Sequence, residues 1–285
     1  MRKYIVFLLF TAVCINGYAG QNDINLSGLS YYDYSKRTYV GDREAFNKLA
    51  NELGVAIAPK LLSPASSLGQ AGFEIGIETS ITPINSNADY WKKAVEGGNP
   101  SDSITVGSFR LRKGFPQSFE VGSTVSYIFL SQMFIGGVEA KWAAVEGFYY
   151  LPDIAARFSV NRLFNAKDLD LTDGGLDVIL SKTFGVGGFM QITPYFAYTY
   201  LEVITSRKTI NATPWDTRDN GGTSEYPIDQ FTLGEKDASH SNNWQQNNRF
   251  IFGLKLKGHI ITAYYEFALV PDAVNSHSFK IAADF

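Results

Sequence analysis

The chain has almost no cysteine, few histidines, and no long apolar stretch beyond its first twenty residues. Its single cysteine is Cys14, and it has three histidines in 285 residues. Cys14 lies in an N-terminal apolar run that we expect to be removed, so the mature chain would have no thiol. Disulfide bonds and cysteine-ligated metals are then excluded, and we predict no cofactor and no metal site. No later apolar stretch reaches the ~20 residues that a transmembrane helix requires.

The chain also lacks an excess of positive charge. Its formal net charge is -3, so loss of Arg2 and Lys3 with the N-terminal run leaves -5. Acidic and basic residues are interspersed along the chain. Nucleic-acid binding requires a basic face, so we predict no nucleic-acid partner.

The first nineteen residues have the three regions of a secretory signal peptide. Arg2 and Lys3 precede an apolar run from 4 to 15, and Gly17 and Ala19 supply the small residues before a cleavage site. The apolar run is too short to span a bilayer. We therefore expect residues 1–19 to be cleaved after export across the inner membrane. Lipidation at Cys14 is not favoured, because it lies inside the apolar run.

The end of the chain alternates between an apolar and a polar face. Phe285, Ala283, Ile281, Phe279 and His277 share one face of residues 275–285 if this segment is a strand, because strand side chains alternate with period two. This pattern resembles the closing strand of bacterial outer-membrane β-barrels, in which a terminal Phe and alternating apolar positions act as the assembly signal. The resemblance assigns that role to Phe279, Ile281 and Phe285. Ala283 departs from it, since the position is often aromatic in that class, and an ordinary edge strand is the alternative.

The same alternation recurs from Gly72 to the C-terminus and predicts ten strands. We place them at about 72–82, 103–113, 119–129, 134–142, 154–161, 176–181, 189–205, 250–257, 261–269 and 275–285. The second changes phase near Gly107, which indicates a bulge. Aromatic residues make up 14% of the chain, which suits the interfacial girdles of a membrane barrel.

The lengths of the connections support a barrel. Single-chain bacterial barrels have an even strand number, both termini in the periplasm, short periplasmic turns and long external loops. Counting back from Phe285 places the long segments 85–102 and 206–246 outside and the tight turns near 113–117, 185–188 and 257–258 inside. Two connections fit less well, because the short turn near Ser131 falls outside and residues 143–153 fall inside. We therefore predict an all-β, transmembrane, antiparallel up-and-down barrel over residues 71–285 in the outer membrane of a Gram-negative bacterium, of no identified subfamily.

Residues 20–70 form a separate N-terminal piece. We expect loosely ordered chain from Gly20 to Val40, then a short amphipathic helix capped by Asp42 and stopped by Gly54. Residues 55–62 are apolar but interrupted by Pro59, so they form a short strand or a packed extended segment. If they pair with another early piece, the barrel has twelve strands. The N-terminal piece is either a plug in the lumen or a periplasmic segment.

Opposite the apolar face, the strands carry charges of both signs. Such charges are costly in a dry core unless they are paired, so they indicate a wet channel or a closed ion-pair network. Ten strands are too few for a wide aqueous pore. The predicted lumen-lining residues are Glu74, Glu78, Arg110, Arg112, Glu120, Glu139, Lys141, Arg157, Asp177, Arg249, Lys255, Lys257 and Glu266.

Three function classes follow. The first is a narrow or gated channel for a small or amphiphilic solute, and here the chain resembles in general terms transporters with a luminal N-terminal hatch, such as the fatty-acid transporter class. The second is a structural or surface-contact barrel that acts through its external loops, with Trp215, Tyr226, Phe231 and Trp244 in the longest. We expect outer-membrane lipid, the barrel assembly machinery and a small-molecule solute as partners.

The third class is an outer-membrane enzyme such as a lipase, a lipid A deacylase or an omptin-type protease. The lipid-acting enzymes place His and Ser two apart on a lipid-facing strand. Here His240 and Ser241, and His277 and Ser278, are adjacent and would point to opposite faces. We therefore predict no catalytic residues. Asp216, Asp219 and Asn220 do not match a calcium-loop spacing.

Overall fold

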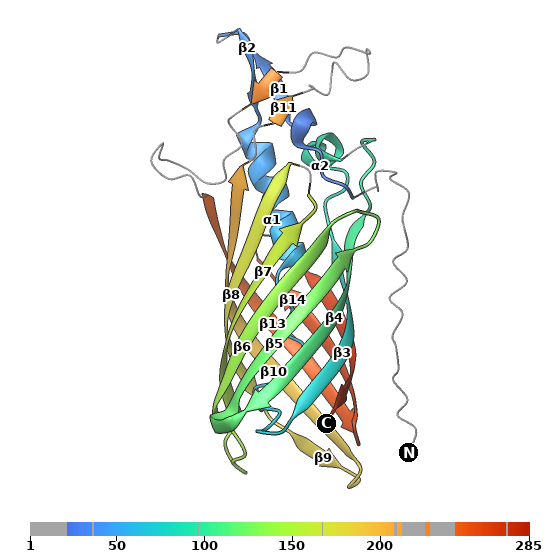
Figure 1. The fold of residues 1–285 in the computed structure, drawn as a ribbon, viewed down its shortest axis with the longest axis vertical. Helices are drawn as coiled ribbons and strands as arrows, with labels where there is room; N and C mark the ends of the chain where they lie inside the picture. The colour runs from blue at the N-terminus through green and yellow to red at the C-terminus, as the bar shows by residue number, and fades with distance from the viewer. Residues whose placement is uncertain are drawn as a thin grey trace, which may run out of the picture.

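The computed structural model describes residues 22–35, 37–95, 97–166, 168–207, 210–212, 226–228, 243–271 and 273–285. Ten strands form one closed antiparallel barrel (Figure 1). Consecutive wall strands pair with each other, and β15 returns to β3 to close the wall. The predicted ten-strand barrel is confirmed. Its strands are β3 (Phe73–Pro83), β4 (Ser103–Phe115), β5 (Phe119–Ile128), β6 (Phe134–Val145), β7 (Asp153–Phe164), β8 (Leu169–Ser181), β10 (Met190–Arg207), β13 (Asn243–Gly258), β14 (Ile261–Leu269) and β15 (Ser276–Asp284).

Five short strands lie outside this ring. β9 (Phe184–Val186) pairs with the start of β10, β1 (Ser30–Asp33) pairs with β2 (Thr38–Gly41), and β11 (Ile210–Ala212) pairs with β12 (Tyr226–Ile228). Among the described residues, β1 and β2 pair only with each other and residues 58–72 form no strand. The twelve-strand alternative is therefore wrong, because the residues that would have supplied the extra pair do not join the wall.

The helical elements are few and short. They are the 3-10 turns η1 (Leu26–Gly28) and η2 (Pro116–Ser118) and the α-helices α1 (Arg43–Ile57) and α2 (Asp89–Ala94). In the part of the chain that is described, neither helix has the length and apolar character needed to cross a membrane.

The outside of the barrel is apolar, and aromatic pairs lie near both ends of the wall. Ile77, Val125 and Ile281 are more than 60% exposed on this face. At one end the rings of Phe134 and Phe164 stack with centroids 5.3 Å apart, and at the other Phe119 and Trp142 stack at 6.0 Å. An apolar band flanked by aromatic residues at two levels is the outer surface of a barrel that lies in a bilayer.

The two rims differ, and we name them by what they carry. The inner rim holds the C-terminus, η2 and the short turn between β13 and β14, while the outer rim holds α2, the β1–β2 hairpin and β11 (Figure 1). At the inner rim Phe73 and Phe285 exchange backbone hydrogen bonds of 3.0 and 2.9 Å. The long connection between β3 and β4 lies at the outer rim, as expected, but short turns occur at both rims, since the connections β5–β6 and β7–β8 also lie at the outer rim.

The N-terminal piece is more ordered than its composition indicated. Asp42 caps α1 as predicted, and its side chain accepts the amide of Ala45 at 3.0 Å. Before it, the described part of residues 22–40 is not loose chain, because η1 and the β1–β2 hairpin are formed and Leu26 and Leu29 are buried. The expectation of a loosely ordered segment was wrong because these apolar residues, scattered among polar ones, find a core only in the folded molecule.

Gly54 does not stop the helix. α1 continues through Val55, Ala56 and Ile57, and only residues after 57 are extended. A Cβ atom at position 54 would lie 2.5 Å from Cγ1 of Val203 on β10. The glycine therefore serves close packing of α1 against the barrel wall and not helix termination.

The bulge expected near Gly107 is also absent. β4 pairs with β3 and β5 without a shift in register, and its inward residues keep even numbers throughout. Ile104 and Val106 point inward together with Arg110. The alternation seemed to change phase because the inward residues of β4 are apolar near the outer rim and charged near the inner rim. The inward positions themselves do not shift.

Candidate functional site

The outer half of the lumen is an apolar core built around α1. Phe46, Leu49 and Leu53 of the helix pack against inward residues of the wall and against the chain before the helix. Since α1 fills the space that these wall residues enclose, this half of the barrel is packed like a protein interior. The wall and outer-rim members of the cluster are Ile24, Leu26, Leu29, Trp91, Ala94, Val95, Ile104, Val106, Ile128, Met133, Ile135, Leu163, Ala166, Leu169, Leu171 and Val203.

In the inner half of the lumen, residues 58–68 run as irregular chain that is neither helix nor strand, and we call them the lumen segment. Wall cations donate hydrogen bonds to its carbonyl oxygens. Arg110 binds the carbonyls of Lys60 at 2.7 Å and Leu61 at 2.9 Å, and Arg157 also binds that of Lys60 at 2.9 Å. Arg249 binds the carbonyl of Pro59 at 2.9 Å. These wall charges thus bind the backbone of the lumen segment.

Wall acceptors bind the amides of the same segment. Glu266 accepts the amide of Leu62 at 2.6 Å, and Glu120 accepts that of Leu68 at 2.5 Å. A non-strand segment inside a barrel cannot satisfy its backbone groups with a neighbouring strand, so unpaired groups there would be costly. The wall side chains provide those partners.

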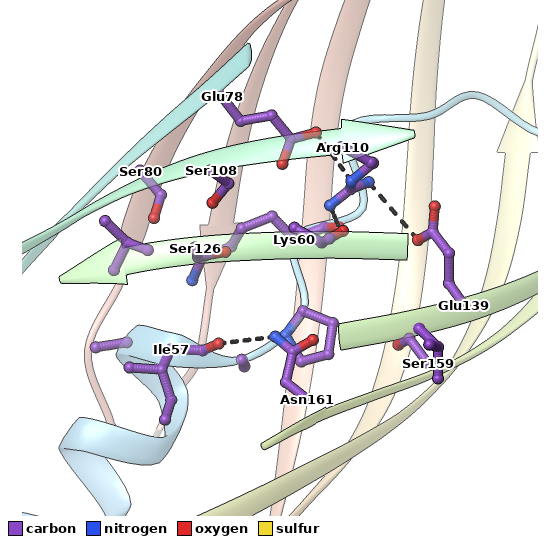
Figure 2. A pocket seen from close by; sticks show the side chains of 16 residues that line it. Ile57, Lys60, Glu78, Ser80, Ser108, Arg110, Ser126, Glu139, Ser159 and Asn161 are labelled. Carbon is purple, nitrogen blue, oxygen red and sulfur yellow. Dashed lines mark hydrogen bonds and ion pairs between the residues drawn. The ribbon is translucent and has the colours of Figure 1, made fainter. Parts of the chain in front are cut away.

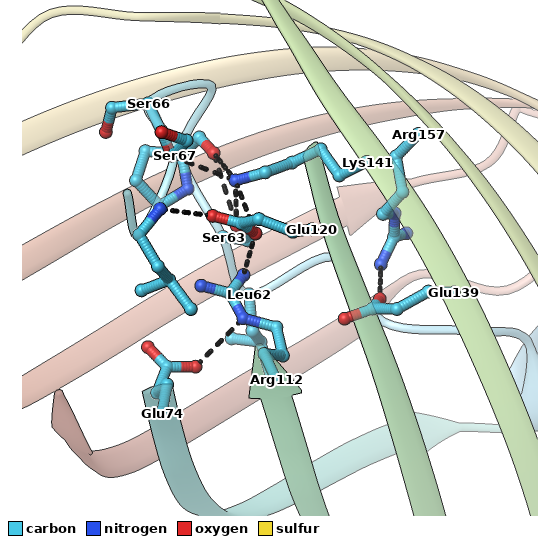
Figure 3. A network of polar contacts seen from close by, with 12 residues as sticks. Leu62, Ser63, Ser66, Ser67, Glu74, Arg112, Glu120, Glu139, Lys141 and Arg157 are labelled. Carbon is cyan, nitrogen blue, oxygen red and sulfur yellow. Dashed lines mark hydrogen bonds and ion pairs between the residues drawn. The ribbon is translucent and has the colours of Figure 1, made fainter. Parts of the chain in front are cut away.

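A first chain of alternating charges lies at the level of the lumen segment. Lys280 binds Glu74 at 2.9 Å, and Arg112 bridges Glu74 at 3.2 Å and Glu120 at 3.8 Å. Lys141 continues the chain to Glu120 at 3.2 Å, and its ammonium group also donates to residues 63, 64 and 66 (Figure 3). These five charges come from five neighbouring strands, β15, β3, β4, β5 and β6.

A second chain of charges continues around the wall. Arg110 binds Glu78 at 3.0 Å and Glu139 at 3.6 Å (Figure 2), and Arg157 then joins Glu139 at 2.7 Å. Two ion pairs extend the chain, from Arg157 to Asp177 at 2.6 Å and from Arg249 to Asp177 at 3.7 Å.

The strand register explains both series of ion pairs. On neighbouring strands it places either two residues of opposite charge, or a charged residue and a glycine, directly across from each other. Glu74 faces Arg112 across β3 and β4, whereas Gly122 faces both Arg112 and Glu139. A Cβ atom at position 122 would lie 2.7 Å from Oε1 of Glu139. The missing side chain provides the room that the long charged side chains occupy.

The structure brings the predicted lumen residues together on the inward face. Eleven of the thirteen have side chains that are nearly or fully buried, whereas Lys255 and Lys257 are 12% and 29% exposed near the inner rim. Both lysines bind Asp284, at 3.5 and 2.7 Å. Phe279, Ile281 and Phe285 lie on the outward face, more than 45% exposed.

Several interior residues were not among the predicted ones. Lys280 and Asp284 share the inward parity of β15, so the alternation that placed Phe279 and Ile281 outside was sufficient to find them. Asp173 was missed because β8 begins at Leu169, well before the expected start at Leu176. No pattern in the sequence marked Lys60 as an interior residue, because only the fold shows that residues 58–68 lie in the lumen.

Little empty space remains inside. A cavity of about 20 Å³ lies between residues 56–60 and the wall, lined by Glu78, Arg110, Glu139 and Asn161 together with four serines (Figure 2). That volume holds about one water molecule. A second hollow, of about 810 Å³, lies at the inner rim below Ser66 and is bordered by Glu146, Asp153 and Lys182. Within the described residues, α1 and the lumen segment thus occupy the space between the wall strands, and the cavity beside residues 56–60 is too small for a solute.

At the inner rim, Glu146 holds the end of the lumen segment. Its carboxylate accepts the Ser67 amide at 2.7 Å and hydroxyl at 2.8 Å, and also the hydroxyl of Ser118. Partial burial opposes ionisation of Glu146, but the hydrogen bonds from Ser118 and Ser67 outweigh it and lower its pKa.

At the outer rim, Glu52 joins α1 to α2. Its two carboxylate oxygens accept the hydroxyl of Tyr90 and the indole Nε1 of Trp91, both at 2.6 Å. Burial of Tyr90 and its bond to Glu52 raise the pKa of the phenol. The loop between β3 and β4 is thereby fixed to the helix that enters the lumen.

The residues considered for catalysis or metal binding do not form a site in the described part. His277 points outward with its Nδ1 3.0 Å from the Tyr265 hydroxyl, while Ser278 points inward and is buried. His259 lies in the turn between β13 and β14. His240 and Ser241, the carboxylates at 216 and 219, Asn220, and the loop aromatics Trp215 and Phe231 lie outside the described residues. No cluster of metal-ligating side chains occurs within the described ranges.

No protein-family model and no curated protein matches this chain. Several solved structures do match this chain. Ail, the attachment invasion locus protein of Yersinia pestis, is 10% identical, with 76% of this chain and 100% of that chain covered and a TM-score of 0.29. KdgM porin is 11% identical over 74% and 99%, with a TM-score of 0.33. The beta domain of the Bordetella autotransporter BrkA is 12% identical over 76% and 99%, with a TM-score of 0.37. TM-scores this low support no argument about fold or function. The barrel is established by the strand pairing within this chain, and we transfer no function from these structures.

Proposed function

We propose that this chain is an outer-membrane barrel that is closed by its own N-terminal residues and acts through its outer rim. One observation carries the proposal: α1 and the lumen segment occupy the lumen, and the cavity that lies between residues 56–60 and the wall has a volume of only about 20 Å³. The charged inward face is therefore engaged in ion pairs and in bonds to the lumen segment, and not in contact with a solute.

The membrane assignment is supported by the outside of the barrel. An apolar band with aromatic pairs near both ends suits a bilayer and would be unfavourable in water. The N-terminal signal sequence supports export of the chain across the inner membrane. Outer-membrane lipid and the barrel assembly machinery are the partners that this location requires, and Phe279, Ile281 and Phe285 are proposed as the assembly signal.

The outer rim is the surface that such a barrel presents for contacts. The β1–β2 hairpin exposes Tyr31, Tyr32 and Tyr34, and β12, from the connection after β10, contacts β2. Tyrosine supplies large contact area at low entropic cost together with a polar group, which suits a binding surface. We assign the protein a structural or surface-contact role, and no catalytic one.

A gated channel is the second candidate, and one observation favours it. In the described part of the chain, the lumen segment belongs to no strand and wall side chains hydrogen-bond its backbone, so it can leave without opening the wall. Its departure would expose the thirteen predicted charges to water and create a narrow path for a small or amphiphilic solute.

Ionic conductance of the refolded protein in a planar bilayer tests both candidates. The complete mature chain is compared with a variant lacking residues 20–70, and protease-resistant, heat-modifiable barrels confirm folding in each case. We expect the complete chain to be silent and the shortened chain to conduct. Steady conductance by the complete chain contradicts the closed barrel, whereas brief openings that disappear when the lumen segment is crosslinked to the wall favour the gated channel.

A further inference from the structure

The N-terminal part of the chain passes through the barrel from one rim to the other. The β1–β2 hairpin lies at the outer rim, α1 descends into the lumen, and the lumen segment reaches the inner rim before Gly72 leads into β3 (Figure 1). The chain therefore crosses the length of the barrel twice in succession. It crosses first through the lumen, as α1 and the lumen segment, and then in the wall, as β3. Its two described ends, Asn22 and Phe285, lie at opposite rims.

The residues before α1 are fixed to the outer rim by hydrogen bonds from their backbone amides to three separate loops. The amide of Asn22 donates to the carbonyl of Leu130, between β5 and β6, at 2.9 Å. The amide of Asn25 donates to the carbonyl of Ala94, at the end of α2, at 2.8 Å. The amide of Leu26 donates to the carboxylate of Asp168, between β7 and β8, at 3.0 Å. This part of the chain is thus built into the outer rim.

The opposite end of the lumen segment is fixed at the inner rim by a tight reversal. The amide of Gly72 donates to the carbonyl of Gly69 at 3.1 Å, and the amide of Gly114 donates to that of Gly72 at 2.9 Å. Gly69 has a φ of +80°, and a Cβ atom at position 114 would lie 2.0 Å from the Gly69 oxygen. The reversal needs glycine both for its backbone conformation and for close packing.

We infer that the chain displays the residues before α1, from Asn22 onward, at the cell surface. This inference rests on the proposed outer-membrane location, in which the rim with the short turns faces the periplasm. An exported chain reaches the barrel from the periplasm, so the residues before α1 have to cross the membrane during assembly while the reversal at residues 69–72 stays behind. Because this reversal joins the lumen segment to β3, the residues before α1 and the far end of β3 then reach the same outer rim. The barrel then acts as a carrier that presents the β1–β2 hairpin outside the cell.

Cysteine labelling on intact cells tests the inference, because the chain after Cys14 has no thiol. In a full-length Cys14→Ala background, Tyr34→Cys reports on the β1–β2 hairpin, where the native side chain is 86% exposed. Asn87→Cys, in the exposed loop after β3, is the outer-rim control. Tyr150→Cys, at an inner-rim site that is 90% exposed, is the periplasmic control. The probe is a polyethylene-glycol maleimide too large to pass through porins, and heat-modifiable mobility shows that each variant is folded.

We expect Tyr34→Cys to react on intact cells to the same extent as Asn87→Cys, while Tyr150→Cys reacts only after the outer membrane is permeabilised. The inference is overturned if Tyr34→Cys reacts only after permeabilisation while Asn87→Cys reacts on intact cells. It is also overturned if Tyr150→Cys alone reacts on intact cells, since the barrel is then inverted. Closure of the lumen does not enter this measurement, so the closed-barrel proposal and the display inference can fail separately.

Discussion

Glu266 of β14 accepts the amide of Leu62 at 2.6 Å, although the two residues are 204 positions apart. The same carboxylate also accepts the Leu61 amide at 3.3 Å and the Tyr195 hydroxyl at 3.2 Å. One inward carboxylate therefore holds two consecutive amides of the lumen segment in place. The wall binds this segment much as a receptor binds an extended peptide, through its backbone groups.

This relationship predicts that the segment can be supplied as a separate molecule. A synthetic peptide of residues 43–70 should block the conductance of the barrel that lacks residues 20–70. N-methylation of the peptide at Leu62 removes the amide hydrogen that Glu266 accepts and leaves a buried carboxylate without that partner. We expect the methylated peptide to block at a concentration at least about tenfold higher, in line with ~1.5–3 kcal/mol for a hydrogen bond to a charged group.

A peptide of the same composition in scrambled order is the matched control. It keeps the charge and the apolar content but not the order of helix and extended chain, so it should leave the conductance unchanged. Equal block by the scrambled and native peptides would mean that the lumen binds any peptide of this composition, and the specific contacts would then have no role.

The central position of Arg157 in the second charge chain gives another prediction. It binds Glu139, Asp177 and the carbonyl of Lys60, and it is 1% exposed. Arg157→Met removes the cation and leaves two carboxylates buried without it. We expect the free energy of unfolding in urea to fall by about 3–5 kcal/mol. Arg162→Met on the exposed face of the same strand is the control, with a change of at most about 1 kcal/mol.

Packing of α1 against the wall can be tested at Gly54. In an isolated helix, Gly54→Ala would be favourable by about 1 kcal/mol. In this barrel the added Cβ would approach Val203 to 2.5 Å, so we expect a net loss of about 1–3 kcal/mol of stability. The double variant Gly54→Ala with Val203→Ala should recover much of that loss, because the atoms that collide are gone. Urea unfolding of the single and double variants measures both effects, and equal instability of the two would show that Val203 is not the obstacle.

Glu146 gives a prediction for pH. Its pKa in the folded chain lies below the ordinary value of 4.5, so its bonds to Ser67 and Ser118 stabilise the fold fully above pH 4.5. That contribution is lost as the pH falls through the lowered pKa, because protonation weakens the acceptor. Since the group is largely solvated, the effect should be under about 1 kcal/mol and local to the inner rim.

Hydrogen exchange at the Ser67 amide measures this loss. Its protection should decrease below pH 4.5 in the native chain relative to Glu146→Gln at the same pH, a comparison that cancels the intrinsic pH dependence of exchange. A constant ratio of the two rates down to pH 2 would contradict the assignment of Ser67 to Glu146.

Much of the wall could be predicted from the chain alone. Side-chain alternation with period two located all ten strands and the inward set from Glu74 to Glu266, because one face of each strand contacts apolar surroundings. The prediction failed where that contrast was missing. Ile104 and Val106 are apolar on the inward face because they meet α1, and this was misread as a bulge.

The sequence by itself determined the antiparallel barrel and the parity of its charges, and it reduced the strand number to ten or twelve. These properties depend on the alternation of side chains along each strand and on the lengths of the connections. Both can be read from short stretches of sequence. Only the tertiary structure decided the path of residues 22–72, the role of Gly54 and the pairing of the interior charges. Those features arise from contacts between residues far apart in sequence, such as Glu266 with Leu62 and Arg110 with Lys60, which no local period records.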